Sequence, residues 1–240
     1  MSVRQVLDAV ASVSMIGASV ALTWRTLSGR YTEQTSGSAS VIARAPIIED
    51  VEAEGIEIAL PDRLGVQPAG RLLLLEFADF ECPYSAEHAR QVLPRILHTY
   101  VDRDRLTYIF LSFPLEALHP SAVAASQAAE CAAEQGRFWE MHSILFSSQS
   151  SFGGPALRQY AEDLNLDMSR FDSCLRRDET AGRVARDIAE GRRVGVTGTP
   201  TFFIGRPTAG NRARILRRIR GAAPFETFAH ALTELLREPG

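Results

Sequence analysis

The stretch FADFECPYS, from Phe77 to Ser85, places one cysteine where redox chemistry could take place. Cys82 is followed by Pro83 and Tyr84, and a serine stands where a dithiol site would carry its second cysteine. A single thiolate can attack a disulfide and form a mixed disulfide, but it has no neighbour with which to store an internal disulfide. The motif therefore predicts monothiol exchange, in the form of disulfide shuffling, small-thiol adduct chemistry or trapping.

Two expected elements position Cys82. The run GRLLLLEFADF, residues 70–80, is almost continuously apolar, which is typical of a buried central strand. Residues 83–100 then repeat apolar side chains at helical spacing, and Pro83 suits a first helical turn. Cys82 would therefore lie at a helix N-terminus, where free N–H groups and the helix dipole stabilise an ionised sulfur. We expect the Ser85 hydroxyl to lie within reach of that sulfur.

Glu76 interrupts the apolar strand six residues before Cys82. A carboxylate inside a buried strand costs free energy unless it has a partner or a function. Glu76 could reach solvent at a strand edge, or it could be a buried proton acceptor with a raised pKa. Because the surrounding run is typical of a central strand, the second interpretation is favoured, and Glu76 joins Cys82 and Ser85 as a candidate catalytic residue.

The chain contains three cysteines, so at least one thiol is unpaired in a monomer. Cys131 lies in an alanine-rich stretch with helical character, and Cys174 lies in a second, shorter one. Both could be small buried side chains, they could form a disulfide between two helices, or one of them could resolve a mixed disulfide from a distance. Sequence spacing leaves these alternatives open, because a disulfide needs two Cα atoms about 6 Å apart.

The order of elements predicts an α/β domain with an insertion. A second buried strand is expected over residues 104–115, and a mainly helical region follows from His119 to about Val194. Strands are expected over 198–205 and 212–221, before a closing amphipathic helix at 224–238.

The N-terminal part of the chain differs in character from the rest. Between Arg4 and Arg25 the only charge is Asp8, so residues 1–29 could form a membrane anchor or a signal peptide, with a soluble amphipathic helix as the alternative. Residues 30–66 are interpreted as a linker and N-terminal extension. An anchor or signal predicts an extracytoplasmic protein, attached to the cytoplasmic membrane by its N-terminal segment.

Other side chains indicate no further chemistry. A net charge of −3 argues against nucleic-acid binding, and the arginines of RILRRIR are expected on a solvated strand edge. No histidine pair has metal-ligand spacing with a cysteine, and no metal or cofactor is expected. We expect His88 on the helix surface, His119 at the start of a helix, and three aromatic residues in the core. These are Phe138, Trp139 and Phe152.

Five blocks of the sequence resemble the DsbA-like branch of the thioredoxin superfamily, and more specifically its membrane-tethered bacterial members. They are LLLEFADFECPYS, FPLEALHPSAVAA, CAAEQGRFWEMHSILF, GVTGTPTFFIG and PFETFAHAL. The resemblance runs from about Leu72 to Leu236. It implies an α/β, thioredoxin-like fold over residues 67–240, with an inserted helical subdomain at about 116–194.

The resemblance also implies roles for individual residues. Cys82 stands at the position of the family's nucleophile, and Glu76 at that of its buried acid. Thr199 and Pro200 fall on the cis-proline loop, which offers backbone groups to an extended substrate. Pro83 and Tyr84 are expected to contact the same substrate.

The resemblance also bears on Cys131, Cys174 and Ser85. Paired cysteines at positions like Cys131 and Cys174 occur in some similar proteins, which favours a disulfide between them. Ser85 departs from the pattern, since family oxidases carry the resolving cysteine there.

Two functions follow as hypotheses. The first is a monothiol thiol-disulfide oxidoreductase that acts on an extended cysteine-containing polypeptide or a small thiol. The second is a redox-inactive peptide-binding or chaperone-like module that uses the cis-proline groove. Glu76 favours the first, because a pure binder needs no buried proton acceptor.

Overall fold

The computed structural model describes residues 47–61, 70–149 and 152–238. The predicted anchor or signal segment, residues 1–29, lies outside the described residues. Within those that are described, no helix combines the length and the apolar character needed to cross a membrane.

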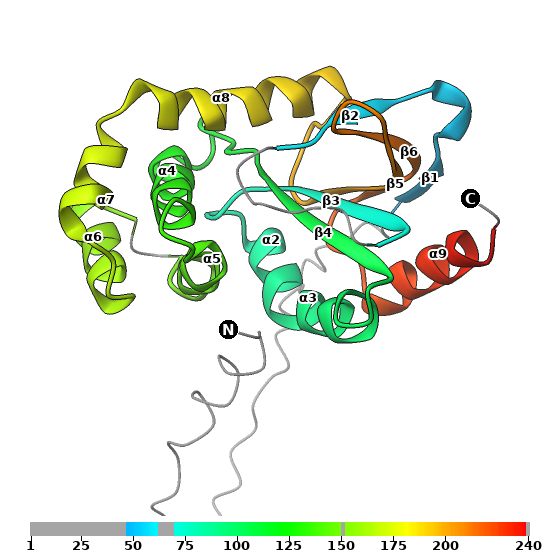
Figure 1. Cartoon of the computed structure of the whole chain (residues 1–240), viewed down its shortest axis with the longest axis horizontal. Helices are drawn as coiled ribbons and strands as arrows, with labels where there is room; N and C mark the ends of the chain where they lie inside the picture. Colours follow the sequence, from blue (N-terminus) through cyan, green and yellow to red (C-terminus); the bar gives the residue numbers. More distant parts are fainter. Residues whose placement is uncertain (1–46, 62–69, 150–151, 239–240) are drawn as a thin grey trace, which may run out of the picture. The chain divides into compact units, whose positions relative to one another are not determined.

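A mixed sheet forms the centre of the domain (Figure 1). Its strands are β1 (Ile47–Asp50), β2 (Glu57–Ala59), β3 (Leu72–Ala78), β4 (Leu106–Ser112), β5 (Thr201–Thr208) and β6 (Arg212–Arg220). The order is β1-β6-β5-β3-β4, with β2 also paired to β6. β3 runs parallel to β4 and antiparallel to β5, so the strand that leads to Cys82 is central. The predicted N-terminal extension thus contributes two strands to the sheet.

Helices cover both faces of this sheet (Figure 1). A helical segment over 83–101 comprises α2 (Pro83–Glu87), π-helical turns at His88–Val92, α3 (Leu93–Ile96) and further π-helical turns at Leu97–Val101. Together with α9 (Phe225–Arg237) it packs on one face, where Ile96 and Leu232 share a core with Leu74, Phe202 and Ile204. The long helix α8 (Asp178–Arg193) lies on the opposite face.

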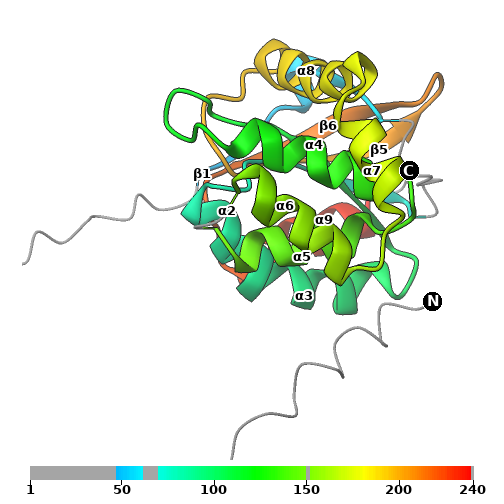
Figure 2. The same cartoon turned by 90° about the vertical axis from the view of Figure 1, so that its left-hand side faces the viewer.

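The inserted helices form a second core beside the sheet (Figure 2). They are α4 (Ala122–Ala133), α5 (Phe138–Ser147), α6 (Gly154–Asp163) and α7 (Met168–Leu175), with α8 leading back to the sheet. Cys131 of α4 and Cys174 of α7 form a disulfide with an S–S distance of 2.05 Å and a Cα–Cα distance of 5.6 Å. Both cysteines belong to this core, which extends to Phe80 beside the Cys82 motif.

Two of the three aromatic residues expected in the core lie there. Phe138 and Phe152 are buried. Trp139 is 37% exposed, so that prediction was wrong for this residue. Its ring instead lies at the surface with one side against Tyr108, at a centroid distance of 5.7 Å.

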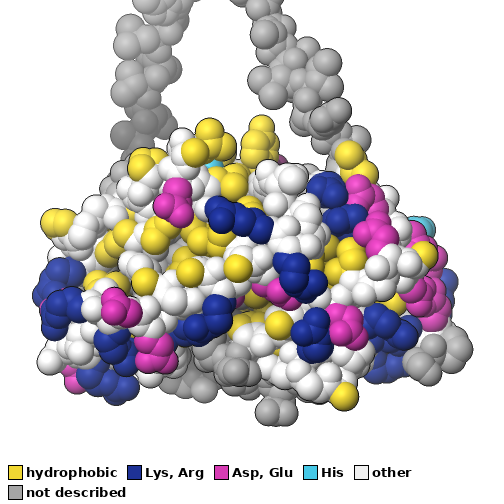
Figure 3. All heavy atoms as spheres, turned by 90° about the horizontal axis from the view of Figure 1, so that it is seen from above, with side chains coloured by type: hydrophobic (Ala, Val, Ile, Leu, Met, Phe, Trp, Pro, Cys, Tyr) yellow, Lys and Arg dark blue, Asp and Glu magenta, His cyan; other side chains and the backbone are white. Residues whose placement is uncertain are grey.

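The arginines of β6 do not lie on a sheet edge, so that prediction was wrong. β5 pairs with one side of β6, while β1 and β2 pair with the other. β1 and the 3-10 turn after it supply carboxylates: Arg218 forms ion pairs with Glu49 and Glu54, and Arg217 with Asp50. On the face shown in Figure 3, arginines are interspersed with acidic and apolar side chains. The β6 arginines therefore fasten the N-terminal strands to the sheet.

A glycine in α8 allows that helix to approach the sheet closely. A Cβ atom on Gly191 would lie 2.5 Å from Cδ2 of Phe113 and 3.0 Å from Cδ1 of Phe77. Both rings belong to the core on this face of the sheet. Such distances would force α8 or the rings to move.

We therefore expect Gly191→Ala to lower the free energy of unfolding by about 2 kcal/mol, because it overpacks this contact. Gly182→Ala in the same helix is the matched control, since its Cβ would meet nothing closer than 3.7 Å. The control should raise stability by about 0.5–1 kcal/mol through helix propensity. Chemical denaturation of the three proteins measures both effects, and equal stabilities of the two variants would contradict the packing argument.

Candidate active site

Cys82 lies at the start of the helical segment, as the sequence predicted. It is the N-cap residue of α2, and its carbonyl accepts the Ala86 N–H at 3.1 Å. Its own N–H donates to the Asp79 carbonyl at 3.1 Å, which closes the turn between β3 and the helix. The residue is only 4% exposed, and it is the free cysteine among the described residues.

The Thr199–Pro200 loop faces this sulfur. The peptide bond between Thr199 and Pro200 is cis, as the resemblance implied. The Cys82 thiol donates to the Thr199 carbonyl at an Sγ–O distance of 3.3 Å. Beside the motif, Pro83 and Tyr84 are exposed, and Tyr84 has 51% of its surface accessible. The structure therefore joins the two predicted parts of the site and leaves Tyr84 at the surface.

Ser85 forms a hydrogen bond with the turn before Cys82. Its side chain is fully buried, and its Oγ accepts the Asp79 N–H at 3.5 Å. Among the described residues, no hydrogen bond joins this hydroxyl to the Cys82 sulfur. The hydroxyl thus braces the turn before the helix.

A buried carboxylate fixes the turn that carries Cys82. The Asp79 carboxylate accepts the Glu81 N–H at 2.8 Å and the Leu115 N–H at 2.7 Å. It also contacts Nδ1 of His119 at 2.8 Å, so His119, which precedes α4, is bound to this turn. Glu81 in turn accepts the Ser121 N–H at 2.7 Å. These bonds tie the loop before α4 to the motif, and sequence reasoning had assigned no role to Asp79 or Glu81.

Gln149 is another residue that sequence reasoning missed. Its side-chain amide donates to the carbonyls of Phe80 and Cys82, both at 2.9 Å. Gln149 follows α5, so the inserted helices bind the backbone of the nucleophile itself. No sequence signal identifies this role, because a lone glutamine after a helix is an ordinary surface residue.

Glu76 is buried on the central strand, so the edge alternative does not apply. The residue is 0% exposed, and burial raises the pKa of its carboxyl well above the ordinary value. The Tyr108 hydroxyl of neighbouring β4 donates to Oε2. Oε1 has no hydrogen-bond partner among the described residues. Both features favour the protonated form of this carboxyl more than exposure to water would.

The prediction that His88 lies on the helix surface was wrong. His88 is fully buried, with its ring centroid 4.4 Å from that of Phe202 and 5.2 Å from that of Phe228. The helix changes to π-helical turns at this residue, and the wider turn alters which side chains face the sheet. Burial, with a smaller contribution from the charge of His142, lowers the pKa of His88 to about 3.

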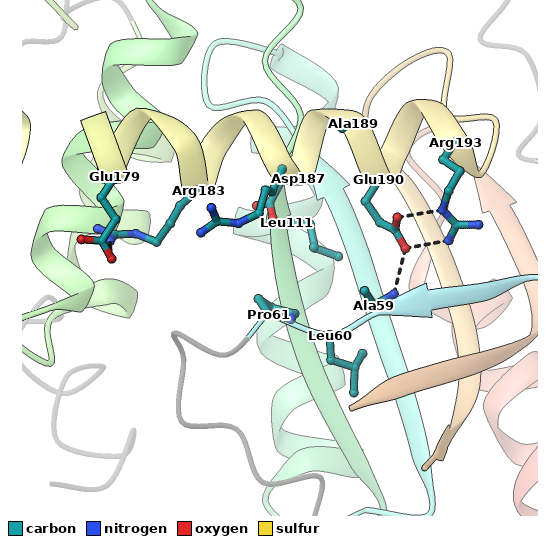
Figure 4. Close-up of a pocket in the computed structure, with 11 residues that line it drawn as sticks. Ala59, Leu60, Pro61, Leu111, Glu179, Arg183, Asp187, Ala189, Glu190 and Arg193 are labelled. Atoms are coloured by element: carbon teal, nitrogen blue, oxygen red, sulfur yellow. Dashed lines mark hydrogen bonds and ion pairs between the residues drawn. The ribbon is translucent and has the colours of Figure 1, made fainter. Parts of the chain in front are cut away.

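A cavity of about 670 Å³ lies elsewhere, between α8 and residues 59–61 (Figure 4). None of the predicted site residues lines it. Glu190 accepts the Ala59 N–H at 2.8 Å and pairs with Arg193, so its charge serves to fasten β2 to α8. Over the described residues, no group of three His, Cys, Asp or Glu side chains could hold a metal ion.

Comparison with known proteins identifies the family. Residues 67–214 match the family model described as thioredoxin. The chain belongs to the thioredoxin family. Solved structures of DsbA-like proteins share the predicted fold with its helical insertion.

Three solved structures illustrate this likeness. Alpha-DsbA1 of Wolbachia pipientis matches with a TM-score of 0.60 and 22% identity, over 75% of this chain and 90% of that chain. Oxidised BdbD of Bacillus subtilis matches with a TM-score of 0.58 and 16% identity, over 79% and 97%. DsbA2 of Pseudomonas aeruginosa matches with a TM-score of 0.55 and 23% identity, over 70% and 90%. At these identities the likeness shows the fold.

Curated relatives of higher identity are much longer proteins. The Na(+)/H(+) antiporter NhaA 3 of Salinispora tropica is 43% identical over 131 residues, which are 55% of this chain and 20% of the antiporter. The NhaA antiporter of Herminiimonas arsenicoxydans is 36% identical over 134 residues, which are 56% and 21%. The chain thus spans about a fifth of the length of these relatives.

The buried histidines predict how this thioredoxin-fold domain responds to acid. His88 stays neutral in the folded protein down to about pH 3, whereas in the unfolded chain it takes up a proton near pH 6.5. Its stabilising contribution is therefore complete above pH 6.5 and is lost as the pH falls toward 3. His88→Phe should make the stability less dependent on pH in that window, by up to about 1.4 kcal/mol per pH unit.

Chemical denaturation between pH 7 and pH 4 measures this slope. His230→Phe is the control, because His230 is exposed on α9. The control should keep the slope of the original protein, and the same slope in His88→Phe would contradict the burial argument.

Proposed function

We propose that this protein is an extracytoplasmic thiol-disulfide oxidoreductase that works with a single nucleophilic cysteine. The observation that carries the proposal is the Cys82 thiol, held at the start of a helical segment and directed at the Thr199 carbonyl beside the cis-proline. That carbonyl lies where an extended substrate would lay its backbone, so Cys82 would meet a disulfide presented there.

The chemistry follows from the absence of a second free thiol among the described residues. Cys131 and Cys174 are bonded to each other and buried, and position 85 carries a serine. The Cys82 thiolate would attack one sulfur of a substrate disulfide, forming a mixed disulfide and releasing the other sulfur as a thiolate. A substrate thiol or an external small thiol must then attack the mixed disulfide and regenerate Cys82. Shuffling, small-thiol adduct chemistry or trapping follows, and dithiol oxidation does not.

Glu76 would accept the proton of the Cys82 thiol. Burial raises the pKa of this carboxyl, which makes its ionised form a stronger proton acceptor. The substrate class is an extended cysteine-containing polypeptide or a small thiol. The exposed Tyr84 would contact the polypeptide beside the sulfur.

Two observations support an extracytoplasmic location. Disulfides such as Cys131–Cys174 persist mainly in oxidising compartments. A structural neighbour from Salmonella enterica serovar Typhimurium, with a TM-score of 0.55 and 21% identity over 77% of this chain and 91% of that chain, is described as a periplasmic thioredoxin-like protein. Attachment to the cytoplasmic membrane through residues 1–29 is part of the same proposal.

The second candidate is a redox-inactive peptide-binding module. One observation favours it: Cys82 is only 4% exposed, which limits access to its sulfur. The two candidates differ in whether that sulfur reacts.

Oxidised glutathione at pH 7 distinguishes them, with intact mass under non-reducing conditions as the readout. We expect a single glutathione adduct on Cys82, an adduct that persists until reduced glutathione is added, and none on Cys82→Ser. Ser85→Cys should shorten the lifetime of the adduct by at least about tenfold, because an intramolecular thiol reacts at high effective concentration. Absence of an adduct on the wild-type protein, with unchanged peptide binding by Cys82→Ser, would establish the binding module instead.

A further inference from the structure

The two oxygens of the Glu76 carboxyl have unequal surroundings. Oε2 accepts a hydrogen bond from the Tyr108 hydroxyl, while Oε1 is buried with no partner among the described residues. Glu76 pairs in register with Phe110 of β4, so Tyr108 is its diagonal neighbour on the same face of the sheet. Glu76 is 0% exposed and Tyr108 is 4% exposed, which keeps this hydrogen bond away from bulk water.

The tyrosine is held in place from outside the sheet. Its ring lies 5.7 Å from that of Trp139 in α5, measured between centroids. Packing between β4 and the inserted helices therefore limits where the hydroxyl can point. A ring confined in this way keeps one donor directed at one oxygen of the buried acid.

The hydrogen bond decides where a proton on Glu76 can reside. A protonated carboxyl has one hydroxyl oxygen and one carbonyl oxygen, and the carbonyl oxygen is the better acceptor. The Tyr108 hydroxyl donates to Oε2 and occupies it. The proton of Glu76 is left on Oε1, the oxygen without a partner.

We propose that Tyr108 is a positioning residue that makes Oε1 the proton-exchanging atom of Glu76 during thiol exchange at Cys82. The inference rests on the function proposed above and adds to it a residue that acts through the buried acid. Tyr108 itself touches neither the substrate nor the sulfur in this scheme.

The exchange step balances without any oxidant or reductant. The step starts with Glu76 ionised: the Cys82 S–H bond breaks, and its proton passes to Oε1 of the Glu76 carboxylate. The thiolate then forms a bond to one sulfur of the substrate disulfide, whose S–S bond breaks with the electron pair left on the departing sulfur. That sulfur takes up the proton from Oε1, so one disulfide replaces another and no net electrons are transferred.

Tyr108→Phe tests this assignment, because it removes only the hydroxyl and keeps the ring. The readout is the rate of adduct formation on Cys82 with excess oxidised glutathione at pH 7. We expect a reduction of about threefold to tenfold, a fraction of the effect usual for loss of a general base. Tyr100→Phe is the matched control, since Tyr100 is a buried tyrosine whose hydroxyl contacts the Ala229 carbonyl of α9. The control should react at the wild-type rate.

A double-mutant cycle separates positioning from a purely structural effect. Glu76→Gln should slow the reaction, and adding Tyr108→Phe to it should change the rate no further, because Tyr108 acts only through that carboxyl. Thermal unfolding shows that each variant is folded under the assay conditions. If Glu76→Gln is not folded under these conditions, Glu76→Ala replaces it in the cycle.

The outcomes distinguish the inference from the function on which it rests. A reactive wild-type protein with equal rates for Tyr108→Phe and Tyr100→Phe would overturn the role of Tyr108 and leave the monothiol function intact. Full additivity in the double mutant would overturn it as well, since Tyr108 would then act independently of Glu76. A wild-type protein that forms no adduct would overturn the proposed function, and the inference with it.

Discussion

The arrangement of the candidate site depends on one contact, between the Cys82 sulfur and the Thr199 carbonyl. The contact joins the start of a helical segment to a cis-proline loop more than a hundred residues later in the chain. It exists because β3 and β5 are adjacent antiparallel strands, so the end of one meets the beginning of the other. A thiol placed there faces the backbone of the cis-proline loop. The rest of the structure keeps these two segments in register.

The inserted helices contribute directly to that arrangement. Gln149 binds the carbonyls of Phe80 and Cys82 from the end of α5, while Asp79 binds the loop before α4. The Cys131–Cys174 disulfide links α4 to α7 within the same helical core. The hydrogen bonds of Gln149 and Asp79 therefore connect the turn at Cys82 to the insertion. The insertion therefore helps to hold the turn of the candidate site in place.

The fold could be predicted well from the sequence because its signals are local. The nearly continuous apolar runs at β3 and β4 indicate buried strands, since both faces of this parallel pair are covered. Cys82 before Pro83 was also visible as a candidate reactive position, and the family resemblance implied the loop at Thr199 and Pro200. Predictions failed where packing decides. The arginine pattern of β6 indicated an edge because nothing local shows that β1 and β2 cover it with carboxylates, and His88 turned inward where π-helical turns replace α-helical ones.

By itself, the sequence determined which atoms are present: the Cys82 sulfur, a serine where a resolving cysteine would stand, and an acid six residues before the sulfur. These are covalent facts that no conformation alters. Tertiary structure alone decided the surroundings of those atoms. Burial raised the pKa of Glu76, and strand pairing brought the Tyr108 hydroxyl to one of its two oxygens. Hydrogen bonds between segments distant in sequence depend on register and packing across the whole domain, and no local pattern of residues encodes them.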